Sequence, residues 1–238
     1  MKYTRIALIC FITLLFVTVS GVQVIATDSV FSTDPISENE EETFLENIEL
    51  SFTREEPKKE AIKRFSVNQS GEFAIGSESN RRNTVCVYTG NGEFKYAYKF
   101  KSNGSFGVEL KENVLYIHFV RSNVSLAVDD SGKIVEVKKI QDTKENNSHW
   151  QKSIFSDEIE IDGKDYRLTN DLGFFNVFVS DYSKLIVTNK DGETTVLYDV
   201  SSMQLGKKIV EFVFIGGIVV FVIIGIIRLI IKGQKENK

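Results

Sequence analysis

The chain has 238 residues, of which 42% are hydrophobic and 26% charged, and its formal net charge is −4. Two Cys and two His exclude a disulfide-dense scaffold and leave little material for a metal centre or a His-based active site. Two Pro, 16 Gly and 11% aromatic residues exclude collagen-like and wholly disordered chains. The mean hydropathy of −0.10 is that of a soluble protein, but it averages over two apolar stretches at the ends.

Residues 1–26 have the pattern of a secretory signal. Lys2 and Arg5 precede an apolar stretch over residues 6–26, which is the order of basic and hydrophobic regions in a signal peptide. We expect cleavage before Thr27. The alternative is an uncleaved anchor, because about 21 residues at 1.5 Å each also cross a bilayer about 30 Å thick.

Residues 27–60 form an acidic stem, with 11 acids against three bases. Ser37 and Glu40 have the spacing of a capping box, which predicts a short amphipathic helix. Its apolar face would hold three residues, Phe44, Leu45 and Ile48. We expect the stem to be a solvated spacer, with binding of a partner or a cation as the alternative. Its charge disfavours nucleic acid and anionic lipid as ligands.

Residues 61–208 change to short alternating runs separated by turn residues, which predicts antiparallel hairpins. Strand patterns flank Gly92, and the same arrangement recurs 40 and 100 residues later at Gly132 and Gly192. A third unit begins with a hairpin at Asp162 and carries an insertion near residues 172–183. We therefore expect an all-β domain of about three antiparallel units, each of about 40 residues and four short strands.

These units resemble the short blades of NHL-type and related bacterial extracytoplasmic propellers. The resemblance covers about residues 62–200 and is one of architecture, so it implies four-stranded sheets but no site residue. Three blades are fewer than the about four to eight that close a ring. The chain would then form a partial propeller or open β-array, share a ring between two chains, or receive blades from a partner. Exposed strand edges favour assembly.

Residues 209–231 predict one transmembrane helix, because between residues 209 and 227 only Glu211 is charged. A short basic tail, residues 232–238, follows. Together with Arg228, its lysines place the C-terminus in the cytoplasm by the positive-inside rule. The expected location is therefore the cell membrane, with a single pass and residues 61–208 outside the cytoplasm.

No catalytic motif is found in the sequence, and we nominate no catalytic, cofactor-binding or metal-ligating residue. His118 lies in an apolar strand and is expected to be a buried, hydrogen-bonded residue. His149 and Trp150 lie in a polar loop, where surface packing is expected. Cys86 is expected to be a buried apolar residue.

The sequence therefore predicts a membrane-anchored, extracytoplasmic binding protein without enzymatic activity or cofactor, such as an accessory subunit of a membrane complex. Its expected partners are the lipid bilayer and a protein bound through β edges, or a second copy of the chain, and not nucleic acid. One alternative is an exported hydrolase that uses carboxylates such as Asp162 and Asp165 in hairpins. The other is a sensor that signals through its transmembrane helix.

Overall fold

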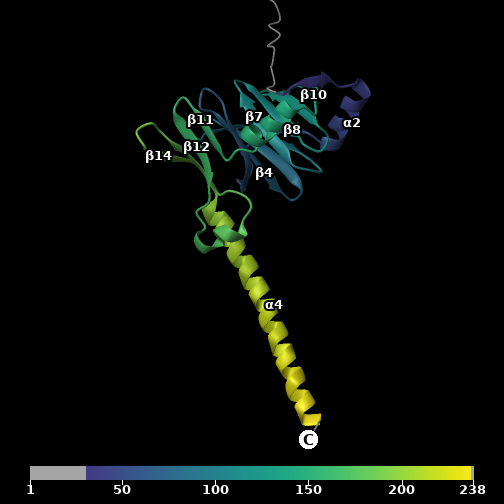
Figure 1. Cartoon of the computed structure of the whole chain (residues 1–238), viewed down its shortest axis with the longest axis vertical. Coiled ribbons are helices and arrows are strands. Elements are labelled where there is room, and N and C mark those ends of the chain that lie inside the picture. The colour runs from purple at the N-terminus through teal and green to yellow at the C-terminus, as the bar shows by residue number, and fades with distance from the viewer. Residues whose placement is uncertain (1–30, 237–238) are drawn as a thin grey trace, which may run out of the picture.

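The computed structural model describes residues 31–236, so the predicted signal or anchor segment, residues 1–26, lies outside the described residues. A β-rich domain stands at one end of a long helix, α4 (Ser201–Glu236) (Figure 1). Within residues 31–236, α4 is the only helix that is long and apolar enough to cross a membrane.

The β domain consists of three antiparallel sheets, each built on four strands that are consecutive in the chain. The first sheet is built on β3 (Ile62–Val67), β4 (Phe73–Ser79), β5 (Arg82–Tyr88) and β6 (Phe94–Phe100). The second is built on β7 (Phe106–Lys111), β8 (Val114–Phe119), β9 (Val124–Asp129) and β10 (Ile134–Ile140). The third contains β11 (Glu158–Ile161), β12 (Lys164–Thr169), β13 (Lys184–Thr188) and β14 (Thr194–Asp199). The prediction of a mostly antiparallel β architecture is confirmed.

The turns that the sequence marked with glycine have a common geometry. Gly92, Gly132 and Gly192 have φ angles of 84°, 96° and 79°, a region that L-residues with a side chain rarely occupy. In the first of these turns, Gly92 N donates to Thr89 O (2.9 Å) and Thr89 N donates to Glu93 O (2.8 Å). These turns connect the third and fourth strands of each sheet, which explains why the pattern recurs.

Part of the segment that we expected to be a solvated spacer is folded onto the sheets. β1 (Thr33–Pro35) pairs with β10, and β2 (Ser51–Thr53) pairs with β6, so each covers an outer edge. Between them lies α2 (Glu38–Ile48), whose first turn is capped as predicted: Glu40 N donates to Ser37 Oγ (3.4 Å). The predicted apolar face of α2 packs on the core through Phe44, Leu45 and the buried Ile48.

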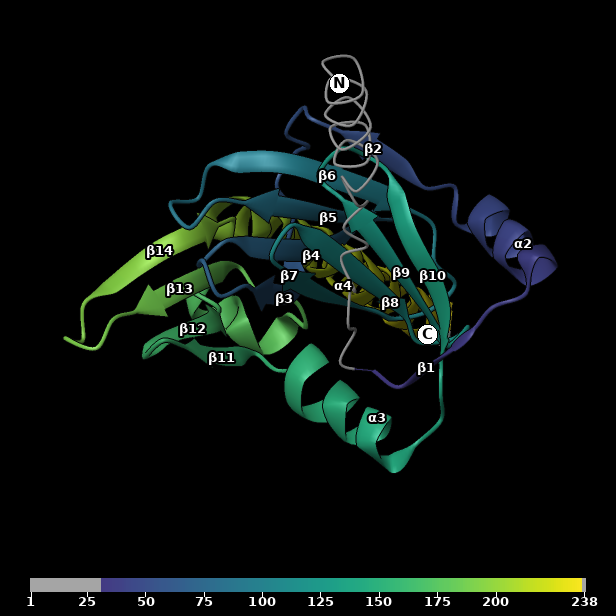
Figure 2. The ribbon, with the colours of Figure 1, turned by 90° about the horizontal axis from the view of Figure 1, so that it is seen from above.

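The first sheet lies between the other two (Figure 2). One of its faces packs on the second sheet through buried residues that include Tyr98, Phe100 and Leu126. Its other face packs on the third sheet through residues that include Phe73 and Tyr166. The innermost strands converge, because β3 contacts both β7 and β11.

Residues 141–157 connect the second sheet to the third, whereas the connection from the third sheet to α4 is much shorter. α3 (Lys144–His149) continues into the π-helical turn η1 (Trp150–Ile154), which packs on β7. After β14, only the buried Val200 precedes α4. Gln204 Nε2 donates to Asp181 O (3.2 Å), and Lys207 forms an ion pair with Glu60 (2.6 Å). The first turns of α4 are therefore attached directly to the β domain.

Candidate functional site

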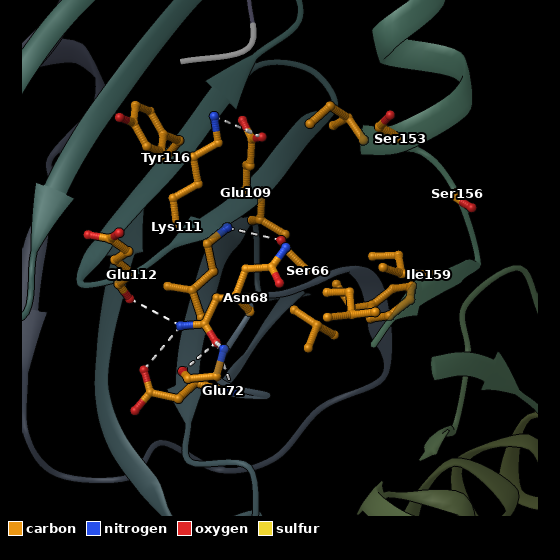
Figure 3. Close-up of a pocket in the computed structure, with 18 of the residues that line it drawn as sticks. Ser66, Asn68, Glu72, Glu109, Lys111, Glu112, Tyr116, Ser153, Ser156 and Ile159 are labelled. Carbon is orange, nitrogen blue, oxygen red and sulfur yellow. Dashed lines mark hydrogen bonds and ion pairs between the residues drawn. The ribbon is translucent and has the colours of Figure 1, made fainter. Parts of the chain in front are cut away.

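A groove of about 1110 Å³ opens where the three innermost strands converge. Its walls are β3, β7, β11 and η1, and we call it the central groove (Figure 3). Its polar lining is shared among the three sheets and η1 and includes Ser66, Asn68, Glu72, Glu109, Lys111, Glu112, Ser153, Ser156, Glu158 and Glu160.

Each of the three strands that line the groove is the edge strand of its sheet. The edges of β3 and β7 approach one another, and Leu110 N donates to the Ser66 hydroxyl (2.9 Å). At the start of β3, Ile62 forms an isolated antiparallel bridge with Tyr182. Apart from that bridge, the groove edges of β3, β7 and β11 pair with no other strand in the described part of the chain. These edges can therefore accept an added strand, except at backbone groups that already have a partner, such as Leu110 N and Glu112 O.

The floor of the groove is held together by the amide of Asn68, which is 5% exposed. Its Oδ1 accepts hydrogen bonds from Glu72 N (2.9 Å) and from the backbone N and hydroxyl of Ser70 (3.1 and 2.7 Å). Its Nδ2 donates to Glu112 O (3.1 Å). One buried side chain thus ties the β3–β4 turn of the first sheet to the β7–β8 turn of the second. Nδ2 also donates to the Glu72 carboxylate (3.3 Å).

The groove lining is acidic, with five glutamates against Lys111 and Lys152. Three of these glutamates form ion pairs: Glu72 with Lys95 (2.7 Å), Glu109 with Lys111 (3.5 Å), and Glu158 with Arg167 (2.8 Å). Glu112 and Glu160 form no ion pair with any residue that the structure describes. The lining therefore offers carboxylate acceptors to a ligand that carries positive charge.

Behind the groove wall, the two histidines of the chain both lie against the ring of Phe31. The rings of His118 and His149 each have their centroid 4.7 Å from that of Phe31. His118 is fully buried, and its Nδ1 lies 3.0 Å from the Ser125 hydroxyl. Its Nε2 lies 3.5 Å from Glu109 Oε2. His118 is thus a buried strand residue, as predicted, whereas the sequence did not predict that His149 would lie beside the same Phe.

The order Ser125, His118, Glu109 matches that of a hydroxyl–imidazole–carboxylate triad. Burial lowers the pKa of His118, which is therefore neutral at pH 7, as a general base must be. However, Ser125 is 4% exposed and His118 is 0% exposed, so a substrate does not reach the hydroxyl. The three groups lie on adjacent strands, where Ser125 is a hydrogen-bond partner of the imidazole Nδ1, while Nε2 and Glu109 Oε2 face one another without a hydrogen bond.

The other residues considered from the sequence do not gather into a site. Cys86 is buried, and burial raises the pKa of its thiol to about 12. Asp162 occupies the β11–β12 turn with φ 53°, and Asp165 forms an ion pair with Arg167 (3.1 Å). Neither aspartate lines the central groove. Among residues 31–236, no group of three or more His, Cys, Asp or Glu side chains is arranged to hold a metal ion.

Comparison with protein-family models gives no match, and comparison with curated proteins gives none either.

Proposed function

We propose that the chain is a membrane-anchored, extracytoplasmic binding protein without enzymatic activity, which holds a polypeptide segment of a membrane complex in the central groove. α4 crosses the cell membrane once. Arg228, Lys232, Lys235 and Lys238 support a cytoplasmic C-terminus, because positive charge accumulates on that side of a membrane helix. The β domain then lies outside the cytoplasm.

The observation that carries this proposal is the convergence of three strand edges on one groove of about 1110 Å³. An extended segment satisfies the backbone groups of such edges by adding a strand, and alternate side chains then enter the groove. The unpaired carboxylates of Glu112 and Glu160 favour a segment with Lys or Arg residues. We therefore propose a basic, extended polypeptide as the ligand.

The same geometry supports an NHL-type interpretation of the three sheets. In a propeller, the innermost strands of all blades surround a central channel, and here β3, β7 and β11 surround the groove. We propose that the sheets are blades of this type and that the bound segment, from a partner or from a second copy, completes the set of inner strands.

Site-specific crosslinking tests the ligand site in the full chain in its native membrane. The photoreactive residue is placed at Ser153 or Ser156, which line the groove, and the same residue at Val196, which is 50% exposed on β14, is the matched control. We expect crosslinks to a polypeptide from the two groove positions and none from Val196. A dimer of the chain would identify the bound segment as a second copy. Equal crosslinking at all three positions would contradict a groove-specific ligand.

A second function, sensing, is favoured by the joint between the β domain and α4. One residue, Val200, separates β14 from α4, and two further contacts, Gln204 with Asp181 and Lys207 with Glu60, attach the helix to the domain. Such a joint can transmit a change in the groove to α4. Replacing residues 209–226 by an unrelated apolar helix distinguishes the two functions. A binding protein would keep both its cellular role and the crosslink formed by a photoreactive residue at Ser153. A sensor would keep the crosslink but lose its cellular role.

A further inference from the structure

The insertion between β12 and β13 places apolar side chains on the surface. It contains the 3₁₀-helical segment η2 (Gly173–Phe178). Phe174 is 71% exposed, Val177 77% and Phe178 49%. Outside α4, only two other large apolar side chains in the described part of the chain are exposed, Val135 and Val196, and these belong to different sheets. Three exposed apolar side chains within five residues form a patch, which usually marks a contact surface.

This patch lies directly beside the start of the apolar part of α4 (Figure 1). The ring centroids of Phe175 and Phe178 lie 5.6 and 5.7 Å from that of Phe212. Phe212 follows Lys208, the last basic residue before the apolar stretch, by four positions, or about 6 Å along a helix axis. When α4 crosses a membrane, η2 is therefore at the depth of the headgroup and acyl boundary, where apolar faces of interfacial segments lie about 5–10 Å deep.

The base of the insertion is fixed to the third sheet, so the patch is held in place. Leu172 is 3% exposed, and its backbone N donates to Asn176 Oδ1 (2.8 Å). Asp171 N donates to the Ser183 hydroxyl (3.2 Å), and the Asp171 carboxylate pairs with Lys184 (2.7 Å). Asp171 thus attaches the base of the insertion to β13 and the residue before it, Asn176 closes η2 on itself, and the exposed apolar side chains lie on η2.

We propose that η2 inserts Phe174, Val177 and Phe178 into the leaflet that faces the β domain, as a second membrane contact beside α4. The occupant of this surface is lipid, because the patch is continuous with the lipid-facing surface of α4. Two contacts, one spanning and one interfacial, fix the tilt of the β domain on the membrane and hence the direction in which the central groove opens. This inference rests on the proposed insertion of α4 but not on the ligand of the groove.

Tryptophan fluorescence of the full chain in phosphatidylcholine vesicles with brominated acyl chains tests the contact. The chain has one tryptophan, Trp150, which is 8% exposed and packs against the second sheet, so the wild type gives the background. We compare Phe174→Trp with Val135→Trp, a control at a side chain that is 43% exposed on β10. A third variant, Phe221→Trp, reports the middle of α4.

We expect bromolipid to quench at least half of the added emission of Phe174→Trp and of Phe221→Trp, and to leave that of Val135→Trp unchanged. Adding Val177→Ser and Phe178→Ser to Phe174→Trp should reduce the quenching. Quenching at Phe221→Trp without quenching at Phe174→Trp would overturn the interfacial contact and leave α4 as an anchor. Absence of quenching at both would overturn the anchor as well. A blue-shifted but unquenched Phe174→Trp would show that protein covers η2 and would also overturn the proposal. The unfolding midpoint of each variant, matched to the wild type, confirms that it is folded.

Discussion

Replacing Gly107 by Ala should displace η1, which forms one wall of the central groove. Gly107 lies on β7, and a Cβ atom at this position would overlap Ile154 Cγ2 and come within 3.0 Å of Trp150 Cζ3. Both neighbours are buried, with 3% and 8% exposure, so neither moves aside freely. Overpacking of this kind costs about 1–3 kcal/mol. We expect about 2 kcal/mol, because the overlapping Cγ2 is bonded directly to the Cβ of Ile154 and cannot move far without the rest of that side chain. For a chain of this size that lowers the Tm by about 4–8 °C.

A double-mutant cycle with Ile154→Ala isolates the overlap. Ile154→Ala removes Cγ2 and costs about 2–5 kcal/mol alone because it leaves a cavity. In that background, Gly107→Ala should cost less than about 0.5 kcal/mol, which corresponds to a coupling of about 1.5 kcal/mol. Trp150 is the only tryptophan and contacts the altered position, so its fluorescence reports urea unfolding of the full chain in detergent. Additive costs, or an unchanged midpoint for Gly107→Ala, would refute the packing of η1 on β7.

Three further predictions concern titration, reactivity and capping. Burial lowers the pKa of His118 below its ordinary value of 6.5, so the unfolded state binds the proton more tightly and stability falls as the pH drops below about 6.5. His118→Gln should reduce the pH dependence of the urea midpoint between pH 7 and 5 and leave the contribution of His149, whose pKa burial also lowers; an unchanged pH dependence would contradict this. The second cysteine of the chain, Cys10, is replaced by serine so that only Cys86 can react. Because burial raises the Cys86 pKa to about 12, a maleimide at about pH 8 should label this variant only in denaturant, and rapid labelling of the native variant would show that the thiol is accessible. Ser37→Ala should cost about 1 kcal/mol in urea unfolding and Ser37→Asp much less, because the cap acceptor at α2 is lost only in the first; equal costs would argue against the cap.

Local signals in the sequence predicted the parts of the fold that depend on neighbouring residues. Ser37 and Glu40 cap α2 because they are three positions apart. Gly92 and Gly132 mark hairpins because a positive φ at these turns is a property of the turn itself. The edge pairing of β1 and β2 could not be predicted in this way, because each has three residues and its pairing partner lies more than 40 positions away.

The central groove was not predictable from motifs, because its contacts join distant parts of the chain. Asn68 donates to the carbonyl of Glu112, 44 positions away, and its side chain resembles that of any turn asparagine in the sequence. His118 and His149 both contact Phe31, but the positions of these three residues in the sequence follow no pattern that would predict the contact. The sequence identified the residues of η2 only as part of an insertion. Their position beside α4 could not be predicted, because it depends on contacts with Phe212, more than 30 positions away.

Binding in the central groove is tested most directly by filling it. Ser153 lies on η1 at the groove wall, and Ser153→Trp places an indole there, whereas Val196→Trp places one on β14 outside the groove. The measurement is the amount of crosslinked polypeptide recovered from a photoreactive residue at Ser156, in native membranes, in the two backgrounds. We predict that Ser153→Trp removes most of the crosslink and that Val196→Trp leaves it at the wild-type level. Equal recovery in both backgrounds would contradict the central groove as the binding site.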